Sequence, residues 1–269
     1  MIQAIISPAK QMNVDGDAFA PRGIPPFPRE TARIVDELRA VEQNEGAEGL
    51  QRLWAVSDKL LAENVERLHD FHPVADAREL DDAETSRRVG PAVFSYTGIQ
   101  YRSMAAHVLG DDALEWLQEH LWILSALYGC ARPFDAVQPY RLEMGAKLAI
   151  DDAGSLYAFW GRRLAERICS TVGTEVVNLA STEYSKAVLP HISPETPIAT
   201  CVFSSSLRNG KPVQKSTESK TARGSMVRWM AETGAGRLED LKRFDVGFVF
   251  DPALSHEGDG RATYVFMKR

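Results

Sequence analysis

The feature that most constrains the fold is a nearly continuous apolar run over residues 122–127. A strand with water on one face alternates apolar and polar side chains. A run without that alternation is typical of a strand covered on both faces, as in parallel sheets flanked by helices. The run therefore predicts a sheet between two layers, and the rest of the chain has to supply the covering helices.

Strand and helix patterns alternate along the rest of the chain, which favours a mixed α/β fold with a mixed sheet and flanking helices. No repeat, low-complexity segment or convincing linker interrupts the pattern, so we expect residues 1–269 to form one compact domain. Strands are predicted over residues 2–6, 92–96, 122–127, 175–179, 198–203, 246–250 and 262–267, and helices over 31–41, 58–69, 99–108, 112–120, 155–172, 182–188 and 221–232.

Turn and capping residues locate several boundaries. Residues 12–28 are rich in Gly, Pro and Asp and predict a long loop, with Pro28 suited to the first turn of a helix. Ser57 is a plausible N-cap for the helix over residues 58–69. The Asn209-Gly210 pair predicts a hairpin turn.

Composition excludes several classes of protein. No stretch approaches the roughly 18–20 apolar residues that a membrane helix needs, and no basic segment precedes the first apolar residues as in a signal peptide. The three cysteines are widely spaced, without a C-x-x-C pair, so neither a disulfide framework nor a zinc knuckle is indicated. We expect a cytoplasmic protein with reduced thiols and no membrane association.

Charge is unevenly distributed within a chain whose net charge is −6. Residues 63–84 carry eight acids and two bases, whereas residues 207–228 carry six bases and one acid. A concentrated basic segment in an acidic protein indicates local binding of an anion. The alternative is a solvated, charged helix face.

Common catalytic and cofactor motifs are absent from the sequence. There is no phosphate-binding G-x-x-x-x-G-K-[ST], no G-x-G-x-x-G and no H-E-x-x-H. His69 and His72 are three residues apart, but a metal site needs further ligands, so no metal or other cofactor is predicted. Residues 7–10 have the S-x-x-K spacing of some acyl-transfer enzymes without their companion motifs.

The densest group of polar side chains lies at residues 128–145, directly after the apolar run. Loops at the carboxyl ends of strands are where α/β sheets bind ligands. Arg132 and Arg141 are suited to grip a phosphate or carboxylate, and Tyr128 and Tyr140 to stack on a base or close a pocket. The alternative is a structural ion-pair network between these arginines and a nearby carboxylate, Asp135 or Glu143.

A series of blocks in fixed order gives the chain a family resemblance. The blocks are I-S-P-A-K at 6–10, S-D-K-L at 57–60, Y-T-G at 96–98, L-S-A-L-Y-G at 124–129, R-P-F-D at 132–135, Q-P-Y-R-L-E-M-G at 138–145, F-W-G at 159–161, N-L-A-S at 178–181, E-Y at 183–184 and A-R-G at 222–224. They span nearly the whole chain, which resembles the bacterial peroxide stress protein family known as YaaA.

This resemblance implies a single α/β domain with a cleft lined by basic residues. It also implies a helix-hairpin-helix-like element of the kind found in DNA-binding proteins, and binding of DNA. The cellular role implied is protection against hydrogen peroxide through lower free iron, which limits Fenton damage to DNA. No settled enzymatic reaction is implied.

The family blocks fall on the residues that already stand out. Tyr96 and Gly98 belong to the implied hairpin, where Gly98 would permit a tight turn whose amides face a phosphate. Binding by neutralised backbone phosphates should weaken steeply with salt. The resemblance assigns the cleft cations to Lys10, Lys59, Arg132, Arg141, Lys186, Lys220 and Arg223, and its blocks add Tyr128, Tyr140, Ser181 and Tyr184.

Two blocks depart from the family pattern. The family's F-Y-A-K-K-A-R-G is replaced by T-E-S-K-T-A-R-G at 217–224, and its G-D-V-Y-T-G by V-F-S-Y-T-G at 93–98. We expect these changes, at Thr217, Glu218 and Thr221 in particular, to remove cations, aromatic faces or carboxylates from the cleft. Such a cleft would suit a small anionic ligand.

Two functions therefore stand side by side. The first is a DNA-binding stress protein without catalysis. The second is an enzyme that uses the same cleft on a nucleotide or nucleobase, for example to cleave an N-glycosidic bond, with Lys10, Glu143 and Lys220 as catalytic groups. A long open groove would favour DNA, and a closed pocket a small substrate.

Overall fold

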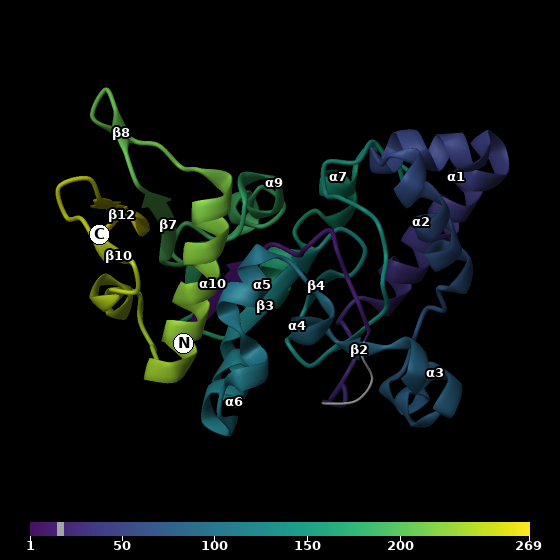
Figure 1. Cartoon of the computed structure of the whole chain (residues 1–269), viewed down its shortest axis with the longest axis horizontal. Coiled ribbons are helices and arrows are strands. Elements are labelled where there is room, and N and C mark those ends of the chain that lie inside the picture. Colours follow the sequence, from purple (N-terminus) through teal and green to yellow (C-terminus); the bar gives the residue numbers. More distant parts are fainter. Residues whose placement is uncertain (15–18) are drawn as a thin grey trace.

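The computed structural model describes residues 1–14 and 19–269, and its centre is a mixed sheet of eight strands within those residues (Figure 1). Five central strands are parallel, and antiparallel strands form the edges. The order is β10 (Phe248–Phe250), β12 (Arg261–Lys268), β7 (Ile198–Ser204), β6 (Glu175–Leu179), β1 (Ile2–Ile6), β3 (Leu121–Ser125) and β4 (Gly129–Ala131), with β11 (His256–Gly258) paired to β12. The predicted α/β fold with a mixed sheet is confirmed.

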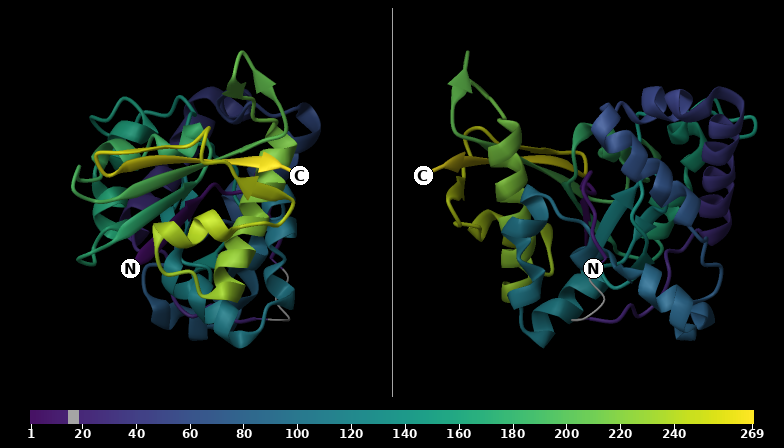
Figure 2. Two further views of the ribbon diagram at one scale, coloured as in Figure 1. Left: turned by 90° about the vertical axis from the view of Figure 1, so that its left-hand side faces the viewer. Right: turned by 45° about the vertical axis from the view of Figure 1, so that its right-hand side comes forward.

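Helices cover both faces of this sheet (Figure 2). All five residues of β1 and all five of β3 are buried, as the apolar run at 122–127 predicts. In register, Ile5 of β1 lies beside Trp122 of β3 on one side and Asn178 of β6 on the other. The core therefore sits on the two faces of the three strands β3, β1 and β6.

The helices come from three stretches of the chain. The loop over residues 12–28, of which 15–18 lie outside the described residues, leads to a helix that begins at Pro28, as predicted. The helices are α1 (Pro28–Trp54), α2 (Asp58–Asp70), α3 (Ala83–Arg88), α4 (Ala92–Ser95), α5 (Ile99–Met104), α6 (Asp111–His120), α7 (Leu156–Trp160), α8 (Arg163–Ile168), α9 (Thr182–Ser185) and α10 (Ser216–Thr233), with single 3₁₀ turns at Ala77–Asp81, Ala106–Val108, Leu189–His191 and Leu238–Arg243. None of them, within the described chain, has both the length and the apolar character needed to span a membrane.

Several predicted boundaries are confirmed. The hairpin at Asn209 and Gly210 joins β8 (Leu207–Arg208) to β9 (Lys211–Pro212), and both turn residues have positive φ. Helix α2 begins directly after Ser57, although the Ser57 side chain makes no capping hydrogen bond. A further pair of short strands, β2 (Gly90–Pro91) and β5 (Ala136–Val137), was not predicted.

Three predicted elements are wrong. The helix predicted over 99–108 ends at Met104, because Ala105 has a left-handed φ of 49°, and Ala106–Val108 form a separate 3₁₀ turn. Where a strand was predicted over 92–96, Ala92–Ser95 form the helical turn α4, because the amides of Ala92 and Val93 donate to the carbonyls of Asp135 and Pro133 and fix the turn. The helix predicted over 155–172 is two helices, α7 and α8. It breaks at Gly161, whose φ of 48° and ψ of −128° lie outside the helical region.

Helices α5 and α10 pack side by side against one edge of the core (Figure 1). Their closest approach is at Gly224, where a Cβ atom would lie 2.0 Å from the carbonyl oxygen of Gln100. Only a residue without a side chain fits there. The two helices therefore act as one wall.

Candidate functional site

A cleft of about 980 Å³ opens at the carboxyl ends of β1 and β6. One side is formed by α2 and the other by α5 and α10, which lie apart in Figure 1. After β1, the chain forms β3 on one side of β1 and later forms β6 on the other side of β1. Such a reversal of strand order is where open α/β sheets bind ligands.

The floor of the cleft joins the ends of the two strands. The Ser181 amide donates to Ser7 Oγ at 2.8 Å, and the two hydroxyl oxygens are 3.1 Å apart. The Tyr101 hydroxyl, from α5, donates to the Ser7 carbonyl at 2.9 Å. These contacts tie the loop after β1 to the loop after β6 and to the α5 wall.

The conspicuous 138–145 block crosses the cleft with Tyr140, Arg141 and Glu143 among its lining residues. The Tyr140 hydroxyl lies 2.7 Å from Ser125 Oγ and 3.2 Å from the Tyr96 hydroxyl. Burial raises the pKa of Tyr140, so its hydroxyl stays protonated at neutral pH. Tyr140 is therefore a fixed, neutral wall of the cleft.

One carboxylate bridges two cations in the cleft. Glu143 Oε1 lies 2.6 Å from Lys10 Nζ and 2.8 Å from Arg141 Nη2. Arg141 also reaches the Trp54 carbonyl through Nη2, at 3.4 Å, whereas its buried Nε–H has no acceptor among the described residues. Glu143 thus occupies the position where an anionic ligand would meet both cations.

The two walls differ in how their charges are paired. On α2, Arg67 forms an ion pair with Glu63. On the other wall, Arg102, Lys220 and Arg223 have no ion pair among residues 1–14 and 19–269. Burial lowers the pKa of Arg223, a sign that its charge is poorly compensated. The wall of α5 and α10 is therefore the cationic side of the cleft.

The structure brings together nine of the predicted site residues. Those lining the cleft are Lys10, Gly98, Tyr140, Arg141, Glu143, Ser181, Tyr184, Lys220 and Arg223. Five others do not line it. Of these, Lys59 and Lys186 are exposed, and Tyr96 and Tyr128 are buried, each with its ring packed edge-on against that of Tyr140.

Arg132 lies away from the cleft. Its guanidinium stacks over the Trp122 ring at 3.7 Å and donates to the Leu121 carbonyl, while its own amide donates to Asp135 at 2.7 Å. Burial raises the pKa of Asp135 and lowers that of Arg132. Of the arginine–carboxylate network considered from the sequence, the Arg141–Glu143 ion pair is present, whereas the Arg132 guanidinium has no ion pair with Asp135 in the described part of the chain. Arg132 is half-buried against Trp122 and does not line the cleft.

The role expected of Gly98 is different in the structure. Its φ of −133° is extended and available to any residue, so the turn itself does not require glycine. A Cβ there would lie 2.9 Å from Ala9 Cβ, so the glycine allows the turn to approach the loop after β1. The turn joins the four-residue helix α4 to α5. Its identification as a DNA-binding element stays a prediction.

The departures from the family pattern do not change the cleft as expected. Thr217, Glu218 and Thr221 are not among the lining residues, whereas Ser216, Lys220 and Arg223 are. Positions 216, 220 and 223 share one face of α10, and the substituted positions lie on other faces. The substitution at 221 therefore leaves the cationic face of α10 intact.

Sequence reasoning missed several polar lining residues, among them Arg67, Gln100 and Arg102. Gln100 gives a weak signal in the sequence as a polar residue between Ile99 and Tyr101, and the structure shows that it is buried, at 6% exposure. Arg67 and Arg102 give no such signal, since charged residues on short helices usually face water.

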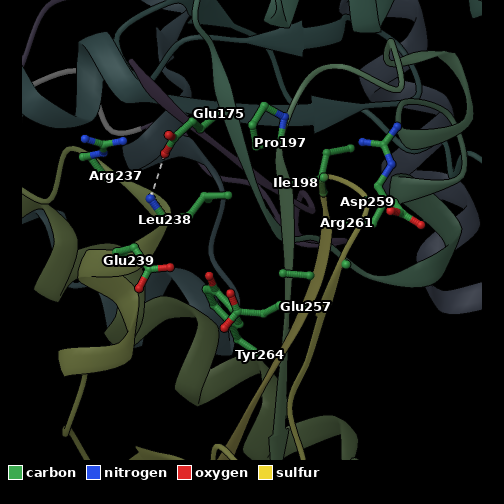
Figure 3. Close-up of a pocket in the computed structure, with 13 residues that line it drawn as sticks. Glu175, Pro197, Ile198, Arg237, Leu238, Glu239, Glu257, Asp259, Arg261 and Tyr264 are labelled. Atoms are coloured by element: carbon green, nitrogen blue, oxygen red, sulfur yellow. Dashed lines mark hydrogen bonds between the residues drawn. The ribbon is translucent and has the colours of Figure 1, made fainter.

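A second, smaller pocket of about 310 Å³ lies at the other end of the sheet, where β6, β7 and β12 begin (Figure 3). Glu175 accepts a hydrogen bond from the Leu238 amide at 2.8 Å. Arg261 donates to the carbonyls of Ile192, Ser193 and Thr196. Each of these two charged groups is therefore bonded to backbone groups.

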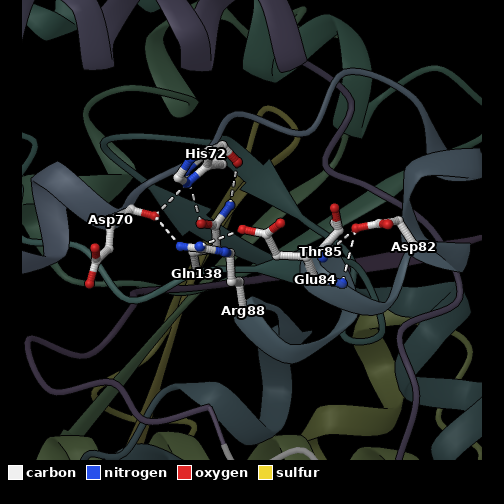
Figure 4. A network of polar contacts seen from close by, with 7 residues as sticks. All are labelled: Asp70, His72, Asp82, Glu84, Thr85, Arg88 and Gln138. Carbon is white, nitrogen blue, oxygen red and sulfur yellow. Dashed lines mark hydrogen bonds and ion pairs between the residues drawn. The ribbon is translucent and has the colours of Figure 1, made fainter.

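The histidines considered as metal ligands serve the structure. His72 exchanges two backbone hydrogen bonds with the Gln138 amide, and its ring meets the Asp70 carbonyl, to which Arg88 also donates (Figure 4). His69 pairs with Glu42. Over the described part of the chain, no group of three or more His, Cys, Asp or Glu side chains is placed to hold a metal ion.

Comparison with known proteins gives the family of this chain. A family model described as peroxide stress protein YaaA matches residues 2–254. A UPF0246 protein of Limosilactobacillus fermentum is 42% identical over 269 residues, covering 99% of this chain and 100% of that protein. UPF0246 proteins of Desulfitobacterium hafniense and Agathobacter rectalis are 37% and 36% identical, and cover at least 98% of the chains compared. The chain therefore belongs to the YaaA family of peroxide stress proteins.

Proposed function

We propose that this protein acts in peroxide defence by binding DNA at the cleft. The observation that carries the proposal is the cationic wall of α5 and α10, where Arg102, Lys220 and Arg223 lack carboxylate partners in the described part of the chain. Cations that are not neutralised within the protein are free to meet phosphates. In this proposal, the lower free iron implied by the resemblance is an indirect effect.

The geometry supports binding through the backbone of the nucleic acid. Lys220 and Arg102 are exposed at the mouth of the cleft, so phosphates reach them from solvent without disturbing the fold. These two side chains would contribute only their positive charge, so their contribution to affinity is independent of base sequence. We expect binding that weakens steeply as salt rises.

The test is the salt dependence of duplex binding, measured by fluorescence anisotropy between 50 and 200 mM salt. The logarithm of affinity should fall with the logarithm of salt, and Arg102→Ala and Lys220→Ala should each reduce the slope by about 0.9. Arg228→Ala is the matched control, because Arg228 lies on α10 outside the cleft and pairs with Glu232. Unchanged slopes in both cleft variants would contradict the proposal.

The cellular part of the proposal is tested separately. Cells lacking the protein should survive hydrogen peroxide better when supplied with the unmodified chain or Arg228→Ala than with the double variant of Arg102 and Lys220. Equal protection by all three chains would mean that protection against peroxide does not depend on the cations of the cleft.

A second candidate function is turnover of a nucleotide or nucleobase. It is favoured by Glu143, a carboxylate held between Lys10 and Arg141 inside the cleft, as a general acid or base would be. Product analysis with a nucleotide and nucleoside panel tests it. Turnover should vanish in Lys10→Ala and Glu143→Gln, and turnover unchanged in both would exclude this function for the cleft.

A further inference from the structure

The interior of the cleft contains hydrogen-bond donors without acceptors. Gln100 Nε2, Arg141 Nε and Arg223 Nε are buried and have no partner within residues 1–14 and 19–269. All three residues line the cleft. Because buried N–H groups in native proteins are nearly always bonded, three unpartnered donors around one cavity point to an occupant rich in acceptors.

Arg223 indicates that part of this occupant is anionic. Arg223 is half-buried with its Nε withdrawn from solvent, and no carboxylate among the described residues lies within ion-pair distance of it. An isolated buried charge is costly, and the usual remedy is a counter-ion. Arg141 contributes a second guanidinium, and planar guanidinium groups match the oxygens of a phosphate.

Gln100 indicates that another part of the occupant is planar and polar. Its side chain is only 6% exposed, and its backbone is held against α10 at Gly224, next to Arg223. A carboxamide in a fixed position reads the edge of a heterocycle through paired donor and acceptor groups. Tyr140 and Tyr184, with Leu142, supply aromatic and apolar surface to the same cavity.

We propose that the interior of the cleft binds a free nucleotide, with its phosphate on Arg141 and Arg223 and the edge of its base on Gln100. The cavity volume of about 980 Å³ is ample for such a ligand. This inference specifies the ligand contacts that the second candidate function would need, whether or not turnover occurs, and it does not depend on the binding of DNA at the mouth of the cleft. Because Arg223 serves both ligands, nucleotide and duplex should compete.

The test is isothermal titration calorimetry of the full chain with the common nucleoside monophosphates and with inorganic phosphate. At least one nucleotide should bind saturably at one site, at least tenfold more tightly than inorganic phosphate. Gln100→Met should lower the ratio of nucleotide to phosphate affinity about tenfold, and Arg223→Met should weaken both ligands at least tenfold. Arg228→Met is the matched control and should bind as the unmodified chain does.

Several outcomes would overturn this inference. If nucleotides bind no more tightly than inorganic phosphate, the protein makes no contact with the base. If the ratio of nucleotide to phosphate affinity is unchanged in Gln100→Met, Gln100 does not contact the base. If Gln100→Met fails to fold by circular dichroism, Gln100→Glu replaces it, since this variant keeps the size and loses the donor. Salt-dependent duplex binding without nucleotide binding would contradict this inference alone, and nucleotide binding without duplex binding would contradict only the proposed function.

Discussion

The two pockets at opposite ends of β6 differ in how several of their charged side chains are paired. At the amino ends of the strands, Arg261 donates to three carbonyls and Lys242 bridges Glu239 and Glu257. At the carboxyl ends, Arg223 and Lys220 have no ion pair among the described residues, and buried donors lack acceptors. The local density of charge is therefore a poor guide to a functional site, and the state of pairing is a better one.

The difference has an energetic meaning. Removing a buried charge that is fully bonded leaves its partners unsatisfied and destabilises the fold, whereas a buried charge that has no partner lowers stability by its presence. Residues that reduce stability persist where they serve a ligand. By this criterion the second pocket belongs to the scaffold, and the cleft is the candidate functional site.

The strongest test of this comparison is Gly224→Ala, in the cleft wall. A Cβ 2.0 Å from the Gln100 carbonyl forces α5 and α10 apart, and we expect the free energy of unfolding to fall by about 3 kcal/mol or more. Urea denaturation measures it. Gly236→Ala, beside the second pocket, is the control, because a Cβ there meets nothing within 4 Å and should change stability by less than about 0.5 kcal/mol.

Arg261→Met tests whether the second pocket is structural. Three carbonyls lose a charged donor, so we expect the free energy of unfolding to fall by roughly 2 kcal/mol. Duplex and nucleotide binding should stay as in the unmodified chain. Arg208→Met, at an exposed position of the hairpin, serves as control. A loss of binding with intact stability would assign the second pocket to function instead.

Arg223→Met tests whether the unpaired charge in the cleft lowers the stability of the fold. Removing a desolvated charge without a counter-ion should raise the free energy of unfolding by about 1 kcal/mol, opposite in sign to the change at Arg261. Thermal and urea denaturation both report it. Arg228→Met, which removes an exposed ion pair with Glu232, should change stability by less than about 0.5 kcal/mol. A clear loss of stability in Arg223→Met would mean that this arginine is a structural residue like Arg261.

The smallest effect is expected for Glu143→Gln. The carboxylate of Glu143 competes with a ligand for Lys10 and Arg141, so its neutralisation should tighten the binding of duplex or phosphate about threefold, or roughly 0.7 kcal/mol. Anisotropy and calorimetry measure the change. Glu232→Gln on α10 controls for the net charge of the protein, and equal tightening in both variants would show that only net charge matters.

Much of the fold can be predicted from the sequence, because buried strands and helices show a characteristic spacing of apolar residues along the chain. The apolar runs at 2–6 and 122–127 predict β1 and β3, and Pro28 and Asn209-Gly210 locate a helix start and a hairpin through their own backbone preferences. The sequence fails at residues 92–96 and 155–172. There, bonds from the distant Pro133 and Asp135 carbonyls and a single glycine conformation override the local pattern.

The candidate site shows the same division. The 138–145 block and the basic face of α10 stand out in the sequence, and Tyr140, Arg141, Glu143, Lys220 and Arg223 do line the cleft. Arg132 has the same chemistry and a similar setting in sequence, yet stacks on Trp122 in the core. Residue type alone does not show which arginine lines the cleft and which packs against Trp122.

By itself, the sequence determined the alternation of strands and helices, the family blocks and the residues able to carry the chemistry. Only the tertiary structure decided which of those residues meet. Ser7 and Ser181 are in contact across 174 positions of the chain because β1 pairs with β6. Strand pairing is a non-local choice made by the whole core, so no local pattern of residues reveals which charges end up facing one cleft and which are bonded within the scaffold.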